Sequence, residues 1–261
     1  MEKKEININK NEKLFKKNID NEENLKFNKD EKIKLKNNFK EIKSSKLNEN
    51  DFNELIKEYP YIDDGIKIEK REPQENTEDN SIYYGEWDIN RNIRHGRGIQ
   101  IYSNGSKYIG NWKNDKAYGK GKLYHSDGDI YDGEWFNDKP NGYGIYTHKD
   151  GTRYEGEWKE DKQNGKGKEI WPDGAIYKRQ YKDGKKNGKG KFIWSDGSIY
   201  EGDFENNNIN GEGIYTFSDK RKYIGVCPES DGRRAADKEF GYVHACAAYP
   251  TSDVKIKIPI E

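Results

Sequence analysis

Large aromatic residues and glycines recur at every second position in short segments of this chain, with polar residues between them. In the clearest copies a Tyr, a Gly and a Trp alternate with other residues, as in Tyr108, Gly110 and Trp112. A period of two places such side chains on one face of a β-strand. A second segment carries Gly119 and Gly121 at the same spacing. The pattern therefore predicts pairs of short strands rather than helices.

The two-strand unit repeats over residues 83–225. From Tyr108 its first strand returns every 23 residues, at Tyr131, Tyr154, Tyr177 and Tyr200. An earlier copy starts at position 83, and a partial one starts at position 223. Self-similarity at a fixed period is the signature of a repeat array, in which each unit is stable only when it stacks on its neighbours.

Polar residues join the strands. A stretch such as 113–116 suits a hairpin loop, and an Asp-Gly pair such as 127–128 is expected to supply the positive φ angles of a tight two-residue turn. Two strands and two turns fill one unit. We therefore predict an all-β fold, an elongated single-layer antiparallel sheet that advances about 10 Å per unit. Strands are expected over 108–112, 119–124 and their equivalents.

The two faces of this sheet are expected to differ. All six Trp and 15 of the 19 Tyr lie between residues 83 and 223, and a Gly opposite a large ring leaves room for that ring over the backbone. The intervening residues are often acidic on first strands and often Lys on return strands, as at Asp132 and Lys122. Adjacent strands would then place opposite charges side by side on a solvated face.

Three sequence elements recur in phase: Tyr-x-Gly-x-Trp, Gly-x-Gly and Asp-Gly. Together they resemble the MORN (membrane occupation and recognition nexus) repeat. The resemblance covers six repeats and the start of a seventh. The resemblance implies a long twisted sheet with an aromatic groove. It also implies non-catalytic roles: scaffolding in cilia and other cytoskeletal assemblies, membrane tethering, or an accessory segment on lipid kinases and methyltransferases. The fifth repeat has Arg179 and Tyr181 where Gly and Trp are expected, which predicts a distorted groove there.

Composition narrows the class of protein. Hydrophobic residues make up 31% of the chain and charged residues 37%, with a formal net charge of zero. This balance gives no argument for a nucleic-acid partner. The two Cys exclude a disulfide scaffold and fit a reducing compartment. No apolar stretch approaches transmembrane length. We expect a cytoplasmic protein associated with the cytoskeleton or a cilium, or one bound peripherally to a membrane.

The chain divides into three segments by pattern. Residues 1–80 form a charged tail rich in Asn, Lys and Glu, expected to be mostly disordered. Residues 81–225 hold the repeats. Residues 226–261 depart from the repeat and contain an alternation near the end that predicts a short terminal strand.

One stretch of the tail, residues 51–59, has the pattern of an amphipathic helix that Pro60 would end. Such a helix is too short to be stable alone in water. We expect it either to dock on the aromatic face of the repeats and hide it, or to form only on another chain. Its apolar face consists of Phe52, Leu55, Ile56 and Tyr59.

Catalytic signals are weak. His125 and His148 take the position that other repeats fill with Tyr102 or Trp171, and we interpret them as packing residues. Two Cys and a His near the end of the chain lack the paired spacing of a metal site. The Gly-x-Gly elements lack the third glycine and the helix of a phosphate loop. We therefore predict no enzyme activity, no metal and no cofactor.

Two main classes of function remain. In the first, the aromatic face binds protein partners or a second copy of the chain. In the second, lysines of the sheet bind anionic phospholipid, although the neighbouring acids weaken such binding. A regulatory subunit of a lipid kinase is a further alternative. The predicted partner-binding residues are Tyr83, Trp87, Tyr108, Trp112, Tyr131, Trp135, Tyr154, Trp158, Trp171, Tyr177, Trp194, Tyr200 and Phe204.

Overall fold

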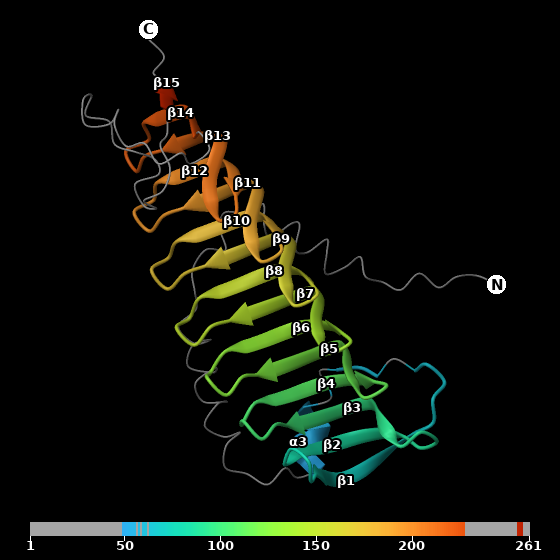
Figure 1. Ribbon diagram of the computed structural model, residues 1–261. Coiled ribbons are helices and arrows are strands. Elements are labelled where there is room, and N and C mark those ends of the chain that lie inside the picture. The colour runs from blue at the N-terminus through green and yellow to red at the C-terminus, as the bar shows by residue number, and fades with distance from the viewer. Residues whose placement is uncertain (1–48, 56, 58, 62, 228–254, 258–261) are drawn as a thin grey trace, which may run out of the picture. The chain divides into compact units, whose positions relative to one another are not determined.

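The computed structural model describes residues 49–55, 57, 59–61, 63–227 and 255–257 (Figure 1). The chain divides into two units, residues 1–45 and 46–261, and every described residue belongs to the second. Expectations for residues 1–48, 228–254 and 258–261 therefore lie outside the described part of the chain.

One antiparallel sheet of 15 strands holds nearly all described residues, and its strands lie side by side in chain order (Figure 1). No helix interrupts the described residues from 63 to 227, so the prediction of an all-β, single-layer antiparallel sheet is confirmed. The strands are β1 (Ile68–Asn76), β2 (Ser81–Asp88), β3 (Ile93–Ile101), β4 (Lys107–Lys113), β5 (Lys116–Tyr124), β6 (Ile130–Phe136), β7 (Lys139–Thr147), β8 (Arg153–Lys159), β9 (Lys162–Ile170), β10 (Ile176–Lys182), β11 (Lys185–Ile193), β12 (Ile199–Glu205), β13 (Asn208–Thr216), β14 (Lys222–Cys227) and β15 (Lys255–Lys257).

The sheet extends beyond the repeats at both ends. Strand β1 lies in the segment that composition assigned to the tail, and it pairs with β2 along most of its length. Strand β15 is the short terminal strand that the alternation predicted, and it pairs with β14. The first repeat, β2 and β3, is therefore paired with β1 on one side and with β4 on the other.

Each repeat hairpin contains a bulge at the first glycine of its Gly-x-Gly element. In the β4–β5 hairpin, Gly110 pairs with Gly121 and Trp112 pairs with Ala117, so three residues centred on Gly119 face one residue of β4. Gly119 has a φ of 67°, which favours glycine. The pairing between repeats, as in β5–β6, shows no register shift.

Strand β3, which contains the bulge at Gly96, bends toward the aromatic face. In β3, Nη1 of Arg94 donates to Oε1 of Gln100 at 2.9 Å, although the two residues are six apart in sequence. Six residues of regular strand would span about 20 Å. The bend therefore brings the two ends of a strand together over the same face.

The tight turns are not where the sequence placed them. The two-residue hairpin turns consist of the polar stretches, as at Asn114 and Asp115, which have φ angles of 52° and 65°. Asn and Asp tolerate this left-handed conformation better than most residues. The Asp-Gly and Asn-Gly segments make wider turns, in which Tyr102 N–H donates to Ser106 O and Gly105 N–H donates to Tyr102 O. The prediction of two-residue turns at these segments is therefore wrong.

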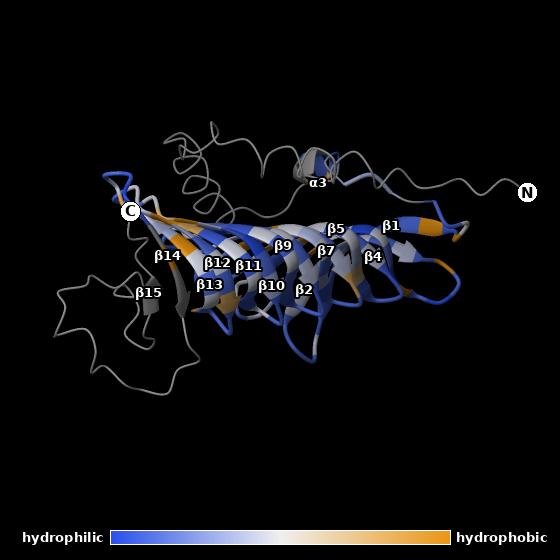
Figure 2. Cartoon of the chain, turned by 90° about the horizontal axis from the view of Figure 1, so that it is seen from above, coloured by the Kyte–Doolittle hydropathy of each residue, from blue (hydrophilic) through white to orange (hydrophobic). Residues whose placement is uncertain are grey.

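A short helix, α3 (Glu49–Leu55), lies to one side of the sheet (Figure 2). Its Phe52 packs in one cluster with Tyr84, Ile99 and Ile109. Tyr84 directly follows Tyr83 on β2, so its side chain points to the face opposite the aromatic one. The helix docks on the repeats, but the prediction that it covers the aromatic face is wrong.

Candidate functional site

Six tyrosines, one from each repeat, form the buried centre of the aromatic face. Each hydroxyl donates to the backbone carbonyl three residues later, at 2.9–3.3 Å. Each ring also lies over glycines of the paired strands: a Cβ added at Gly121 would lie 2.3 Å from the hydroxyl oxygen of Tyr108. The glycines are therefore required by the rings. The six tyrosines have exposed fractions of 0–4%. They are Tyr83, Tyr108, Tyr131, Tyr154, Tyr177 and Tyr200.

Three tryptophans, Trp112, Trp135 and Trp158, each connect their repeat to the one before it. Trp135 packs edge-on between Tyr108 and Tyr131, with a ring-centroid distance of 5.1 Å to both. Its Nε1–H donates to the carbonyl of Gly121 in the preceding repeat at 2.9 Å. Trp112 and Trp158 repeat this hydrogen bond at 3.3 and 3.2 Å. Contacts of this kind explain why a repeat needs its neighbour.

A second line of rings is more accessible, and we call it the outer row. Every member is at least partly exposed, and Tyr102 is 36% exposed. Rings that lie between two members of the row contact both. The ring centroid of Tyr146 lies 6.0 Å from that of His125 and 4.7 Å from that of His148. The outer row consists of Tyr102, His125, His148, Trp171, Trp194 and Phe217.

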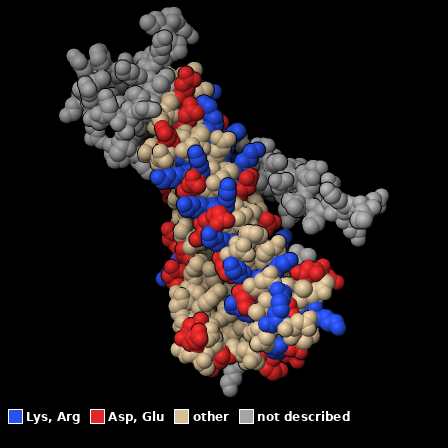
Figure 3. Space-filling view, turned by 45° about the vertical axis from the view of Figure 1, so that its right-hand side comes forward, with Lys and Arg blue, Asp and Glu red and all other residues tan. Residues whose placement is uncertain are grey.

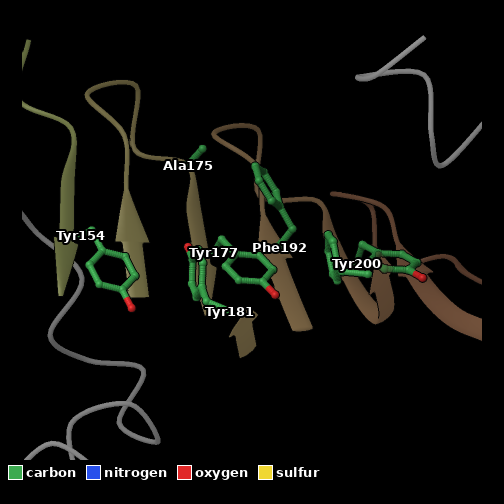
Figure 4. Packing of buried hydrophobic residues seen from close by; sticks show 7 residues of the cluster. Tyr154, Ala175, Tyr177, Tyr181, Phe192 and Tyr200 are labelled. Carbon is green, nitrogen blue, oxygen red and sulfur yellow. The ribbon is translucent and has the colours of Figure 1, made fainter. Parts of the chain in front are cut away.

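The fifth repeat keeps the line of rings while its backbone is altered. Arg179 has a φ of 119°, a conformation that L side chains rarely adopt. Tyr181, in place of the expected Trp, still packs edge-on against Tyr154 and Tyr177, at 5.0 and 5.3 Å (Figure 4). The expected distortion is thus present in the backbone at Arg179, but the aromatic face continues through it.

A partly buried ion pair accompanies this change. Nζ of Lys186 lies 2.7 Å from Oε2 of Glu169, and both side chains are about 15% exposed. The hydroxyl of Tyr181 donates to the same carboxylate at 3.1 Å, and Lys186 also lies 4.9 Å from the Trp171 ring centroid. Burial, followed by the nearby charge of Glu169, raises the pKa of Tyr181 far above its ordinary value. This polar cluster was not predicted from the sequence.

The opposite face carries paired charges between several neighbouring strands. Figure 3 shows that acidic and basic side chains are intermixed along the length of the sheet. Lys122 lies 3.0 Å from Asp132 across β5 and β6, and Lys189 lies 2.8 Å from Asp203 across β11 and β12. The expectation that neighbouring strands place opposite charges side by side is confirmed at these positions.

The first repeats break this charge pattern, and α3 covers the break. Phe52 is 1% exposed, and its ring lies 4.7 Å from that of Tyr84. Nζ of Lys70 lies 4.7 Å from the Phe52 ring centroid and 3.0 Å from Oε1 of Glu49. Tyr59 is also buried in this cluster. Ile56 and the side chain of Leu55 lie outside the described part of the structure.

The residues after α3 also bind this face. Asp64 accepts from Lys113 at 3.0 Å and lies 3.2 Å from Nε2 of the buried His95. Asn111 donates to the carbonyl of Pro60 at 3.5 Å. A polar cluster therefore continues the contact that Phe52 begins.

The described residues form neither a metal site nor a membrane-spanning helix. Among the described residues, no group of three or more His, Cys, Asp or Glu side chains is arranged to hold a metal ion. His244 and Cys246 lie outside those residues. No described helix has the length and apolarity needed to cross a bilayer.

A family model of the MORN repeat matches residues 83–107, 108–130, 131–153, 154–176, 180–199 and 200–220. The chain belongs to the MORN repeat family. The fifth match starts at 180, after Arg179, so it begins beyond the altered Gly position. No protein with a curated description matches the chain.

One solved structure with similarity to this MORN protein is the TCP domain of SAS-4 (dCPAP) in complex with a proline-rich motif of Ana2 (dSTIL) from Drosophila melanogaster. The match has 16% sequence identity, covers 60% of this chain and 83% of that chain, and has a TM-score of 0.27.

The MORN array brings the predicted contact residues onto one face, but they differ in accessibility. The six tyrosines are almost fully buried, and so are Trp112, Trp135 and Phe204. The partly exposed members are Trp87, Trp158, Trp171 and Trp194. A partner on this face would therefore contact mainly the outer row and these tryptophans.

Sequence reasoning did not identify the patch under α3. The signal was present at two positions: Tyr84 and Ile109 are apolar where repeats three to six carry a charged residue, such as Asp132. Ile99 is a weaker signal, because Ile145 and Ile214 take the same position in later repeats. A residue that departs from the repeat pattern on an otherwise charged face indicates a local contact.

Proposed function

We propose that this MORN-repeat chain is a non-catalytic scaffold of the cytoplasm that binds protein partners through its aromatic face, within a cytoskeletal, ciliary or membrane-associated assembly. The observation that supports this proposal is the outer row. It presents a partly exposed aromatic ring in each repeat, next to rings that are already fixed by packing. Rigid aromatic side chains contribute large contact area at protein interfaces at a small entropic cost.

The position of α3 supports an open aromatic face. Its Phe52 contacts Tyr84, Ile99 and Ile109 on the opposite face. The helix can therefore remain docked while a partner occupies the outer row. A partner contact at the outer row would not require this helix to move.

The charged face favours a protein partner over a membrane. Basic residues attract anionic lipid when their charge is not cancelled nearby. Lys122, Lys189 and Lys191 each lie next to an acidic side chain, at 3.0, 2.8 and 3.7 Å. The attraction of this face for a lipid surface is reduced accordingly.

Site-specific photo-crosslinking in the cells that make the protein tests the proposal. A photoreactive amino acid replaces Trp194 on the outer row, or Lys189 on the charged face as the control. We expect the probe at position 194 to crosslink a defined protein. The control probe at position 189 should not crosslink that protein. The Trp171→Ala, Trp194→Ala variant should then lose that partner, and Lys189→Ala should retain it.

Two results would contradict this scheme. Crosslinks from the charged face alone would place the interface on the wrong side of the sheet. Retention of the partner by the Trp171→Ala, Trp194→Ala variant would show that the outer row is not the contact. A crosslink to a second copy of the chain would identify the partner as self-association.

A further inference from the structure

A pocket of about 690 Å³ lies at the first end of the aromatic face, between the β1–β2 turn and the start of the repeats. Its aromatic walls come from β2, β4 and the turn between β3 and β4, and they include Trp87, Tyr102 and Trp112. Tyr102 is the most exposed of these rings. The pocket is therefore open to a side chain from outside.

Guanidinium groups of the chain itself already stack on rings that line this pocket. Cζ of Arg94 lies 4.3 Å from the ring centroid of Trp112 and 5.7 Å from that of Tyr83. Cζ of Arg71 lies 5.0 Å from the centroid of Trp87. Guanidinium planes stack well on indole and phenol faces, and the contact strengthens when water is excluded. The aromatic surface at this end is thus suited to arginine.

The acidic residues of the pocket outnumber its basic ones. Asp115 is paired with Arg94 at 3.1 Å. Glu75, Asp79 and Asp138 also line the pocket, and none of the three has an ion pair with a described Lys or Arg. The pocket therefore has an excess of negative charge that its own Arg94 does not neutralise.

A buried donor is also left without an acceptor at this end. Trp112, Trp135 and Trp158 donate their Nε1–H to a glycine carbonyl of the preceding repeat. Trp87 belongs to the first repeat, and its Nε1 is buried without a hydrogen-bond partner among the described residues. The first repeat thus lacks a contact that the next three repeats have.

We propose that this pocket binds an arginine side chain of a peptide segment in a partner protein. The guanidinium stacks on the exposed ring of Tyr102 and faces the carboxylates of Glu75, Asp79 and Asp138. The inference builds on the proposed function, because it assigns a chemistry to one end of the same aromatic face. It makes this end selective for charge, whereas the outer row beyond it contacts a partner mainly through rings.

The test uses the full-length chain and a short Gly-Ser peptide with arginine at every second position. A matched peptide carries citrulline, which has nearly the same shape without the charge. Indole N–H signals of the six Trp are followed by NMR during titration. We expect saturable shifts at Trp87 and Trp112, no shift at the distant Trp194, and at least about fivefold weaker binding of the citrulline peptide.

Two variants probe the charges. Glu75→Gln with Asp79→Asn removes two acidic groups from the pocket, and Asn at 79 can still accept from the N–H of Ser81 as Asp79 does. Glu201→Gln with Glu212→Gln removes two charges from the far end of the array and serves as the control. We expect the pocket variant to bind the arginine peptide about three- to tenfold more weakly and the control to bind normally.

Equal binding of the citrulline peptide, or equal binding by the two variants, would overturn the arginine pocket. So would shifts of similar size at all indoles, or no saturable shift. None of these outcomes touches the scaffold proposal, which stands or falls on crosslinks from Trp194. Loss of those crosslinks with normal titration at Trp87 and Trp112 would refute the scaffold and keep the pocket.

Discussion

The Phe52→Ala substitution should release α3 from the sheet while leaving the repeats folded. Phe52 is 1% exposed, and burying a Phe side chain contributes roughly 1.5–3 kcal/mol. The ring pair with Tyr84 at 4.7 Å adds about 0.5–1.5 kcal/mol. The Lys70 ammonium over the ring adds about 0.5–1 kcal/mol. A loss of about 3 kcal/mol in docking free energy is therefore expected.

Native-state hydrogen exchange measures this loss directly. A helix of seven residues does not persist alone, so its amides are protected only while it is docked. A loss of about 3 kcal/mol corresponds to a fall in protection of more than about 100-fold for the amides in the last turn of α3. Amides of β6 to β9 should keep their protection, because these strands do not contact Phe52.

Three further variants locate the contact. Ile99→Ala changes the sheet side of the same cluster and should also release α3, whereas Asn53→Ala removes an exposed side chain and should not. Trp135→Ala lies on the aromatic face and should weaken the array without selectively exposing the helix. Free exchange of the α3 amides in the unaltered protein would contradict the docking of this helix. Protection that survives both Phe52→Ala and Ile99→Ala would contradict the role of the Phe52 contact.

Other consequences follow from single residues. Arg179→Gly should raise the free energy of unfolding by about 1 kcal/mol in a urea titration, because glycine relieves the φ of 119°. Gly144→Ala should cost about 3 kcal/mol, since its Cβ would lie 2.4 Å from the Tyr131 hydroxyl oxygen, and Gly174→Ala, in open space, should cost about 1 kcal/mol. Burial raises the pKa of Tyr131 and Tyr154 well above the ordinary value of 10.0, so their contribution to stability is complete below pH 10.0 and is lost as the pH rises above it. Tyrosinate absorbance should then appear together with loss of the β-sheet circular dichroism signal. Liposome flotation should show weak binding to anionic vesicles that disappears by about 0.15 M salt, and salt-resistant binding would contradict the charge pairing.

The repeat array was predictable because its physics is local and periodic. A ring over a Gly pair needs residues two apart on one strand and a glycine on the next, and this requirement recurs every 23 residues. The turns were harder to assign. Asn114-Asp115 and Asp127-Gly128 are both plausible hairpin turns in sequence, and only the register shows that the first is the two-residue turn.

The position of α3 was not predictable from the average repeat. The apolar pattern of this helix is visible in the sequence, but an average over the repeats makes the second face mostly charged. Tyr84 and Ile109 are exceptions to that average in the first two repeats, whereas the position of Ile99 is apolar again at Ile145 and Ile214. Strand β1 was missed for a related reason, since its side chains are mostly exposed and its composition matches the tail.

The location of such exceptions has a physical cause. Each buried Tyr, Trp and Gly of the aromatic face touches the next repeat, so a change there disturbs two repeats at once. Positions outside these buried rows carry no such constraint and can differ from repeat to repeat. The apolar patch under α3, the Glu169–Lys186 pair beside Trp171, and Arg94 in the terminal pocket all lie at such positions. The uniform rows thus hold the array together, and selectivity for a partner is expected at the residues that break the repeat.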